Sequence, residues 1–221
     1  LPAKGRLREP AIALLEDAGL GPEEPGERAL AFPCRNAPVE VLLVRATDIP
    51  EYVQDGVVDC GITGADLVEE RGARVNELLR LGFGSCTLEA AVPAESPVVE
   101  LAGLRGLRVA TVYPRLAARL LAKAGVSVEL VDVTGSVEVA PRPGLADAIV
   151  DVTETGSRLR ANNLRVLDPV LESTPRFLAN RERYADARPR AVIDPLALAL
   201  RGAVPAADRV ESEDEDLVRL A

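Results

Sequence analysis

Short apolar runs alternate with amphipathic stretches along most of this chain of 221 residues. The apolar runs are rich in Val, Leu, Ile and Ala, which predicts strands. They cover residues 39–44, 57–62, 88–93, 107–111 and 126–133. Apolar residues at helical spacing predict helices over 10–18, 65–70, 116–124 and 191–201. Strands and helices in alternation are typical of an α/β fold with mainly parallel sheets.

A second series of strands and helices lies inside the first. The strand expected at 177–179 returns to the part of the chain that precedes residue 88, so the series between them forms a separate unit. This order predicts two lobes connected by two crossovers, with a cleft between them. Lobe I comprises residues 1–87 and 176–221, and lobe II comprises residues 88–175.

Composition and charge narrow the function classes. The net charge of −9 argues against nucleic acid as a partner, because phosphate backbones are bound by basic surfaces. No apolar run approaches the roughly 20 residues that span a bilayer, so no membrane association is expected. The chain contains no histidine, which excludes catalytic triads and histidine-bound zinc. Its three cysteines are widely spaced, which favours reduced thiols in a cytoplasmic protein.

The most informative segment runs from Asp147 to Leu164. An apolar run over 148–152 carries an acid at each edge, then breaks into a loop of small and hydroxylated residues, and a helix is expected to start at Leu159. A strand, a tight polar loop and a helix start together present backbone N–H groups to a phosphate. Acids at the mouth of such a loop can hold ribose hydroxyls or a divalent ion. Turn chemistry alone also explains Thr, Gly and Ser in a loop, so a purely structural interpretation stays open.

Three further segments accompany this loop in the same order along the chain. They are Lys4-Gly5-Arg6, Gly56-Val-Val-Asp-Cys-Gly-Ile-Thr-Gly-Ala-Asp66 and Thr134-Gly-Ser-Val-Glu-Val-Ala-Pro-Arg-Pro-Gly-Leu-Ala-Asp147. The set resembles the catalytic subunit of ATP phosphoribosyltransferase, the first enzyme of histidine biosynthesis. The resemblance implies a two-lobed fold like that of the periplasmic binding proteins. It also implies transfer of the phosphoribosyl group of phosphoribosyl pyrophosphate to N1 of ATP, with release of pyrophosphate.

The resemblance assigns the sugar 5′-phosphate to the loop. The backbone amides and hydroxyls involved are those of Glu154, Thr155, Gly156, Ser157, Arg158 and Leu159. Asp151 and Asp147 are the candidates for the ribose hydroxyls or for Mg²⁺, which the two pyrophosphate-bearing substrates imply. The family usually has Thr-Gly-x-Thr-Leu here, whereas Arg158 stands in place of the second Thr. Arg158 either replaces the lost hydroxyl with charge-assisted hydrogen bonds or points to solvent.

The remaining candidates are placed outside this loop. The resemblance maps Arg6 and Arg28 to the leaving pyrophosphate, where they would act as the catalytic cations. The nucleotide-binding candidates are Lys4, Arg45, Asp59 and Gly64. For any single arginine a surface ion pair is the alternative. The apolar strand expected ahead of the Lys-Gly-Arg segment is nearly absent, which leaves open that the native N-terminus lies upstream of Leu1.

The chemistry implied by the resemblance is compatible with a protein that lacks histidine. Adenine N1 carries a free lone pair, so its attack needs no general base. The protein then has to position the substrates and neutralise the charge of the departing pyrophosphate. About 40 residues follow the returning strand, which favours the short form of the enzyme, although a truncated long form stays open. The short form implies a regulatory subunit resembling histidyl-tRNA synthetase, and dimers of this chain. The alternative function is a solute-binding or effector-binding module of the same fold, since fold does not decide function.

Overall fold

The computed structural model describes residues 1–22, 30–142, 144–153 and 156–205. They divide into two compact units. Unit 1 comprises Leu1–Gly84 and the described residues from Thr174 onward, and unit 2 comprises Ser85–Ser173. The divisions lie three and two residues before those expected from the sequence, because the strand that begins at Cys86 already belongs to the sheet of unit 2 and the strand that begins at Pro175 to a sheet of unit 1.

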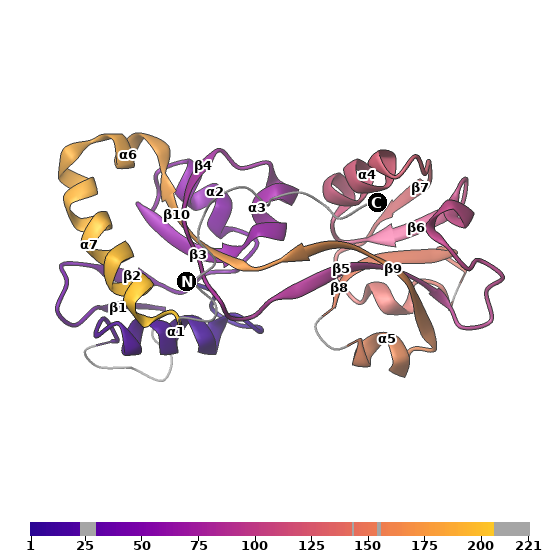
Figure 1. Ribbon diagram of the computed structural model, residues 1–221, viewed down its shortest axis with the longest axis horizontal. Coiled ribbons are helices and arrows are strands. Elements are labelled where there is room, and N and C mark those ends of the chain that lie inside the picture. Colours follow the sequence, from indigo (N-terminus) through magenta and orange to yellow (C-terminus); the bar gives the residue numbers. More distant parts are fainter. Residues whose placement is uncertain (23–29, 143, 154–155, 206–221) are drawn as a thin grey trace. The chain divides into compact units, whose positions relative to one another are not determined.

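Unit 1 contains two small sheets and the helices around them (Figure 1). Its elements are α1 (Arg8–Asp17), β1 (Ala31–Pro33), β2 (Glu40–Leu42), α2 (Ile49–Gln54), β3 (Cys60–Gly64), α3 (Ala65–Arg71), β4 (Val75–Arg80), β10 (Pro175–Asn180), α6 (Arg181–Ala185) and α7 (Ala187–Ala203). The strands β1 and β2 form an antiparallel pair, and the other sheet has the order β3-β10-β4. All six residues of β10 are buried, which makes this returning strand the centre of its sheet.

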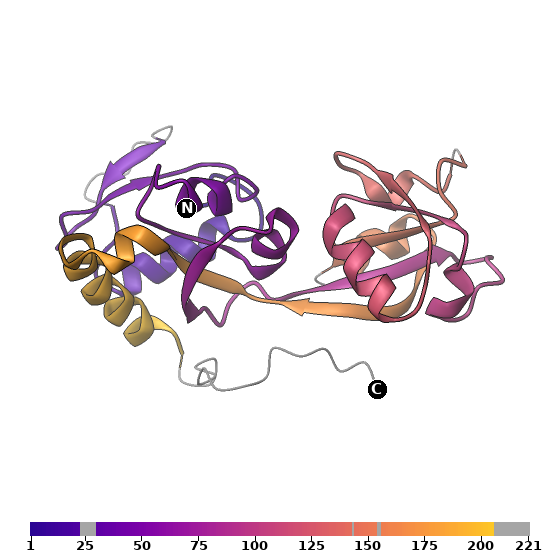
Figure 2. The ribbon, with the colours of Figure 1, turned by 90° about the horizontal axis from the view of Figure 1, so that it is seen from above.

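Unit 2 is built on one five-stranded sheet with the order β7-β6-β8-β5-β9. Its elements are β5 (Cys86–Pro93), η1 (Leu101–Leu104), β6 (Arg108–Thr111), α4 (Pro114–Lys123), β7 (Glu129–Asp132), η2 (Val137–Val139), β8 (Ala148–Thr153), α5 (Ser157–Ala161) and β9 (Leu164–Ser173). The helix α4 packs on one face of the sheet and α5 on the other (Figure 1). The long strands β5 and β9 run side by side, as both ribbon views show (Figure 2).

The α/β class is confirmed, but the expected dominance of parallel pairing is wrong. Parallel pairs occur at β6–β7 and β6–β8, which helical crossovers connect. The strands β3 and β4 pair antiparallel with β10, and β5 pairs antiparallel with both β8 and β9. Both β5 and β10 follow directly after the chain has passed from one unit to the other. They therefore enter their sheets without the helical crossover that parallel neighbours require.

Three strands were missed in the sequence, and one helix is shifted. The missed strands β1, β4 and β9 carry polar residues or proline, which hides their periodicity. The helix expected to start at Leu159 begins at Ser157 and ends at Ala161, and Leu164 opens β9 instead.

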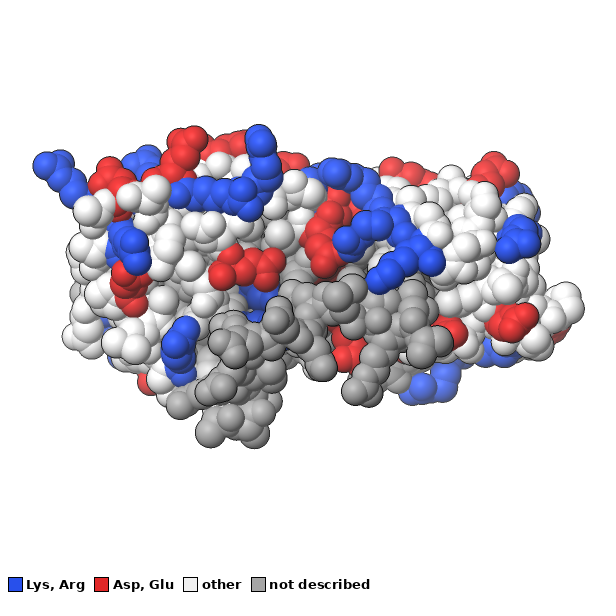
Figure 3. All heavy atoms as spheres, turned by 45° about the horizontal axis from the view of Figure 1, so that its top comes forward, with Lys and Arg blue, Asp and Glu red and all other residues white. Residues whose placement is uncertain are grey.

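The visible face of the molecule carries acidic and basic side chains interspersed (Figure 3). None of the helices in the described part of the chain is both long and apolar enough to cross a membrane.

Candidate functional site

In unit 2 the candidate residues gather at the C-terminal end of β8. Ile149 packs against Leu159 of α5, and side chains alternate along a strand, so Asp151 and Thr153 lie on this same face of the sheet. Glu89 of β5 lies directly opposite Asp151 in the antiparallel ladder. The Thr153 hydroxyl donates a 2.5 Å hydrogen bond to Glu89 Oε2. Two carboxylates and a hydroxyl therefore share one small patch at the strand end.

The carboxyl group of Asp151 is held in an unusual electrostatic state. Burial raises the pKa of Asp151 from 3.8 to about 6, and the nearby Glu138 carboxylate acts in the same direction. The Val152 backbone N–H and the positive charge of Arg158 oppose this increase in pKa. A half-buried carboxyl group at a strand end with a perturbed pKa is a candidate for ligand binding.

The turn that follows β8 positions backbone amides for an anion. Gly156 adopts a left-handed backbone with φ of 64° and forms the N-cap of α5. Ser157 is exposed in the first turn of α5, where the backbone N–H groups of a helix point toward its N-terminal end. Leu159 is 4% exposed and belongs to the core, so only its backbone can serve a ligand. The candidates Glu154 and Thr155 lie outside the described residues.

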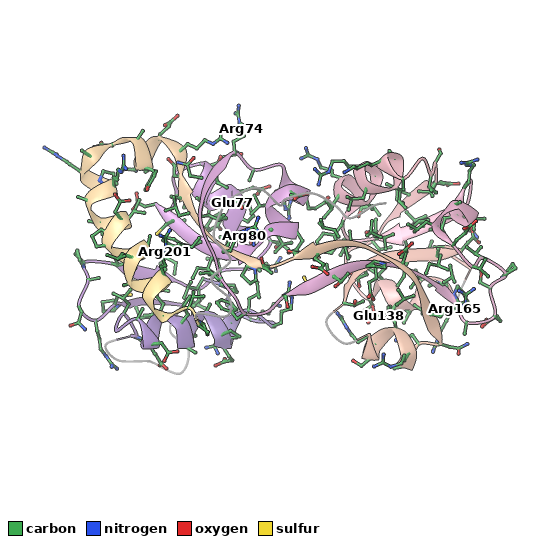
Figure 4. The ribbon with its side chains drawn as sticks, viewed as in Figure 1. Arg74, Glu77, Arg80, Glu138, Arg165 and Arg201 are labelled. Carbon is green, nitrogen blue, oxygen red and sulfur yellow. The ribbon has the colours of Figure 1, made fainter. Side chains whose placement is uncertain are left out.

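The side chain of Arg158 has a carboxylate neighbour. Arg158 Nη1 lies 3.9 Å from Glu138 Oε1, and the guanidinium remains largely exposed. Figure 4 shows Glu138 beside α5, to which Arg158 belongs. The guanidinium of Arg158 faces solvent and also lies at the candidate phosphate site. Both alternatives for Arg158, a hydrogen bond to the phosphate and a solvent-facing side chain, therefore stay open.

Asp147 lies at the other end of β8, and its candidate role is corrected by the structure. Four residues along a strand separate it from Asp151 by roughly 13 Å. Its two carboxylate oxygens accept hydrogen bonds from Arg108 Nη2 at 2.9 Å and Nε at 3.2 Å, and Oδ2 also accepts from the Arg108 backbone N–H at 3.0 Å. The hydrogen bonds from Arg108 lower the pKa of Asp147. Asp147 thus connects β8 to β6 and does not join the site around Asp151.

In unit 1 Arg6 and Gly64 meet around a buried acid. Arg6 Nη1 donates a hydrogen bond to the carbonyl oxygen of Gly84, and Arg6 Nη2 lies 4.0 Å from Asp66 Oδ1. Asp66 is 1% exposed and lies in the first turn of α3. A Cβ atom at Gly64 would lie 2.1 Å from Asp66 Oδ1, so glycine is required to admit this carboxylate. This pairing was not predicted from the sequence, although Arg6 and Asp66 both lie within the quoted motifs.

The other unit 1 candidates do not form one cluster with Arg6. Lys4 is exposed ahead of α1, and Arg45 is exposed just after β2. Asp59 precedes β3 and so lies at the opposite end of that strand from Gly64, where its carboxylate is 3.6 Å from Arg183 Nε. The direction of β3 therefore places Asp59 and Gly64 at opposite ends of one strand, and their nucleotide-binding roles stay predictions. Arg28 lies outside the described residues.

Sequence reasoning missed three polar residues of the unit 2 patch. Glu89, Thr153 and Glu138 come from β5, β8 and η2, which are distant in sequence. The available signal was weak: an acid inside the otherwise apolar strand that begins at Cys86. Within the described residues, no group of three or more acidic or cysteine side chains is arranged to hold a metal ion.

Two compact units with α/β sheets, one of which has a strand that ends in a glycine turn, define a class of two-unit α/β folds. Solved structures of this class include the alkanesulfonate-binding protein SsuA from Xanthomonas axonopodis pv. citri, with a TM-score of 0.53 and 19% identity over 74% of this chain and 62% of that one. That likeness shows the fold alone. It confirms the resemblance in fold to the periplasmic binding proteins.

The particular family follows from closer matches. Residues 45–202 match the family described as HisG, ATP phosphoribosyltransferase. The ATP phosphoribosyltransferase of Methanopyrus kandleri is 47% identical over 93% of this chain and 71% of its own length. That of Thermococcus gammatolerans is 48% identical over 80% of this chain and 85% of its own length. A structure described as the ATP phosphoribosyl transferase (HisG:HisZ) complex from Thermotoga maritima matches with a TM-score of 0.76 and 27% identity, over 92% of this chain and 96% of that one.

The chain belongs to the ATP phosphoribosyltransferase family. It is a phosphoribosyl-transferring enzyme of the first step of histidine biosynthesis. The family assignment made from the sequence motifs is thereby confirmed.

Proposed function

We propose that the patch at the end of β8 and the turn before α5 bind the phosphoribosyl part of phosphoribosyl pyrophosphate during its transfer to N1 of ATP. The observation that carries this proposal is the combination of the left-handed Gly156 with the half-buried Asp151, which lies five residues earlier on β8. Backbone N–H groups at the start of α5 suit the 5′-phosphate, and the Asp151 carboxylate suits ribose hydroxyls. Glu154, Thr155, Ser157 and the backbone of Leu159 complete the phosphate loop in this proposal.

The reaction needs positioning more than proton transfer. The lone pair of adenine N1 forms the new bond to C1 of the ribose while the bond from C1 to the pyrophosphate oxygen breaks. The sugar carries positive charge during this exchange and the leaving group carries negative charge. Asp151, whose carboxylate accepts a hydrogen bond from the Val152 backbone N–H, fixes the ribose in place for attack. The hydrogen bond from Thr153 orients Glu89 beside it.

Mg²⁺ enters this proposal with the substrates. The ion usually takes one or two carboxylates together with substrate oxygens and water. Asp151 and Glu89 fit that requirement, because they are direct cross-strand neighbours with half-buried carboxylates. When bound, the ion supplies neutralisation of pyrophosphate charge.

The cations of unit 1 are assigned to ATP and to the leaving pyrophosphate. Arg6 is held by the Gly84 carbonyl and lies near Asp66, which fixes its guanidinium. Lys4 and Arg45 are exposed and bring positive charge to the same protein unit. Arg28 completes the set by family resemblance.

A regulatory partner and a cellular location are also proposed. The Thermotoga maritima structure is described as a complex of HisG with HisZ, and this chain matches 96% of the chain compared. We infer that this chain likewise assembles with a HisZ-type subunit resembling histidyl-tRNA synthetase, and that it forms dimers by itself. Cys34, Cys60 and Cys86 are all free thiols, which supports a cytoplasmic location.

The test is formation of N1-(5-phosphoribosyl)-ATP, followed by its ultraviolet absorbance, from ATP, phosphoribosyl pyrophosphate and Mg²⁺. The assay is run with this chain alone and with a HisZ-type subunit. Asp151→Asn is expected to lower kcat/KM for phosphoribosyl pyrophosphate at least about 100-fold, since a half-buried, charged hydrogen-bonding group is lost. Asp147→Asn is the matched control, and it should retain activity because it lies at the far end of β8.

Equal losses in the two variants would contradict the assignment of the patch. Turnover that appears only with the HisZ-type subunit would support the partner proposal. Binding of phosphoribosyl pyrophosphate without turnover under either condition would instead favour a binding module.

A further inference from the structure

Three carboxylates lie around the C-terminal end of β8, and one guanidinium lies beside them. The carboxylates belong to Asp151, Glu89 and Glu138, and the guanidinium belongs to Arg158 of α5. The charges of Arg158 and Glu138 both act on the carboxyl group of Asp151, in opposite directions. A phosphate brought to this patch meets several like charges, and like charges at short range disfavour binding. A cation on the phosphate side would offset this repulsion.

The backbone of Arg158 is fixed, whereas its side chain is loosely held. The side-chain amide and the backbone N–H of Asn162 both donate to the Arg158 carbonyl oxygen, at 2.9 and 3.2 Å. The next residue, Leu159, is buried and anchors α5 to the core. The side chain of Arg158 is 71% exposed, and within the described residues its guanidinium forms an ion pair and no hydrogen bond. The start of this side chain is therefore positioned, and its charged end can change partner.

Glu138, the partner of Arg158 in this ion pair, is held more firmly. Its side chain is only 14% exposed, and Glu138 Oε1 lies 3.9 Å from Arg158 Nη1 (Figure 4 labels Glu138 beside α5). The neighbouring Val137 is buried in one core cluster with Ile149 and Leu159. The pair keeps the guanidinium close to the end of β8, but an ion pair with an exposed member stabilises little. A phosphate can therefore replace Glu138 as the partner of Arg158 at small cost.

The chemistry of a guanidinium suits such an exchange of partners. Its planar fork of N–H donors matches two phosphate oxygens at once, and these charge-assisted hydrogen bonds are stronger than neutral ones. A second guanidinium lies close to the turn before α5, since a Cβ atom at Gly156 would lie 3.2 Å from Arg160 Nη1. Arg160 therefore adds positive charge to the same turn. The two arginines give the acidic patch one side that attracts a phosphate.

We propose that Arg158 binds the 5′-phosphate of the phosphoribosyl group and that Glu138 is its partner only while the site is empty. On binding, the guanidinium leaves the Glu138 carboxylate for the phosphate, and Asp151 takes the ribose hydroxyls. This inference rests on the proposed function and deepens it, because it names the side chain that selects a phosphorylated ribose over a plain one. A side chain that only faces solvent is the alternative, and the experiment separates the two.

The experiment measures binding to the full chain by calorimetry with two probes. Ribose 5-phosphate carries the 5′-phosphate without a pyrophosphate, whereas inorganic pyrophosphate represents the leaving group. Arg158→Gln is expected to raise the Kd of ribose 5-phosphate at least about tenfold and to change that of pyrophosphate less than about twofold, because only the 5′-phosphate loses charge-assisted hydrogen bonds. Arg158→Lys keeps the charge but not the fork, so its Kd for ribose 5-phosphate should lie between those of the unmodified chain and Arg158→Gln.

Arg105→Gln is the matched control for the loss of one positive charge. Arg105 directly precedes the strand that follows η1, β6, and β6 runs parallel to β8, so Arg105 lies at the opposite end of the sheet from Asp151. Its guanidinium donates to Gly125 O at 3.2 Å. This variant should bind both probes as the unmodified chain does. Unchanged binding of ribose 5-phosphate by Arg158→Gln, equal weakening for the two probes, or equal weakening by Arg105→Gln would each overturn the proposal.

Glu138→Gln tests the exchange of partners. It removes the competing carboxylate and keeps Arg158, so ribose 5-phosphate should bind at least about twofold more tightly. Weaker binding by Glu138→Gln would overturn the exchange. Asp151→Asn separates this inference from the proposed function, because it changes the patch and leaves Arg158 in place. Loss of activity in Asp151→Asn together with unchanged binding by Arg158→Gln would keep the phosphoribosyl site and remove Arg158 from it.

Discussion

Replacing Asp151 with Asn is expected to make the folded protein more stable at neutral pH while it weakens binding of phosphoribosyl pyrophosphate. The reason lies in the half-buried carboxyl group at the end of β8. At neutral pH it is ionised in a place where burial disfavours charge. An amide of the same shape removes that charge but cannot accept hydrogen bonds from ribose hydroxyls as strongly.

The size of the expected stabilisation follows from the pKa of Asp151 in the folded protein and in the unfolded chain. The folded value is about 6 and the ordinary value is 3.8. Between these pH values the folded protein binds more protons than the unfolded chain, so its free energy of unfolding falls as pH rises through this window. The full difference corresponds to about 3 kcal/mol. Because Asn must also be desolvated, Asp151→Asn is expected to raise the free energy of unfolding by about 1–3 kcal/mol at pH 7.5. At pH 4 almost no gain is expected, because the carboxyl group of the folded protein is already protonated.

The assay is urea unfolding followed by circular dichroism at pH 7.5 and at pH 4, together with thermal unfolding. A gain of 1 kcal/mol corresponds to a rise in Tm of about 2–4 °C for a chain of this size. Asp147→Asn should behave in the opposite way at pH 7.5 and lose about 1 kcal/mol, because it breaks the two-oxygen pairing with Arg108. An Asp151→Asn protein that is less stable at pH 7.5, or equally stabilised at both pH values, would refute the reasoning.

Other substitutions and conditions test the remaining contacts. Gly156→Ala should lower stability by about 1 kcal/mol and raise KM for phosphoribosyl pyrophosphate, because φ is 64° and the new Cβ would lie 3.2 Å from Arg160 Nη1; unchanged kinetics would argue against the turn as a binding element. Asn180→Ala should cost about 2–3 kcal/mol in urea unfolding, since its amide donates to Val53 O and Gln54 O at 2.8 Å each. Removal of Mg²⁺ with EDTA should abolish turnover and leave Tm unchanged; turnover in EDTA would contradict the metal proposal.

The sequence predicted the part of unit 2 that depends on local chemistry. The apolar run, the turn at Gly156 and the helix after it all lie between Ala148 and Ala161, so propensity and spacing define them without help from the rest of the chain. The partners of these residues could not be predicted in this way. Glu89 reaches Asp151 from 62 residues away through an antiparallel ladder, and no local pattern specifies that register.

The direction of each strand explains why some candidate residues were separated. An acid at each edge of the run before the loop suggested one site with two carboxylates. Only the residue at the C-terminal end of β8 can face the turn, and Asp147 at the other end binds Arg108 instead. The same reasoning applies to Asp59, which lies just before β3, and to Gly64, which is its last residue. A motif defined by order along the chain therefore identifies which strands approach the ligand, whereas strand direction decides which residue of each strand does so.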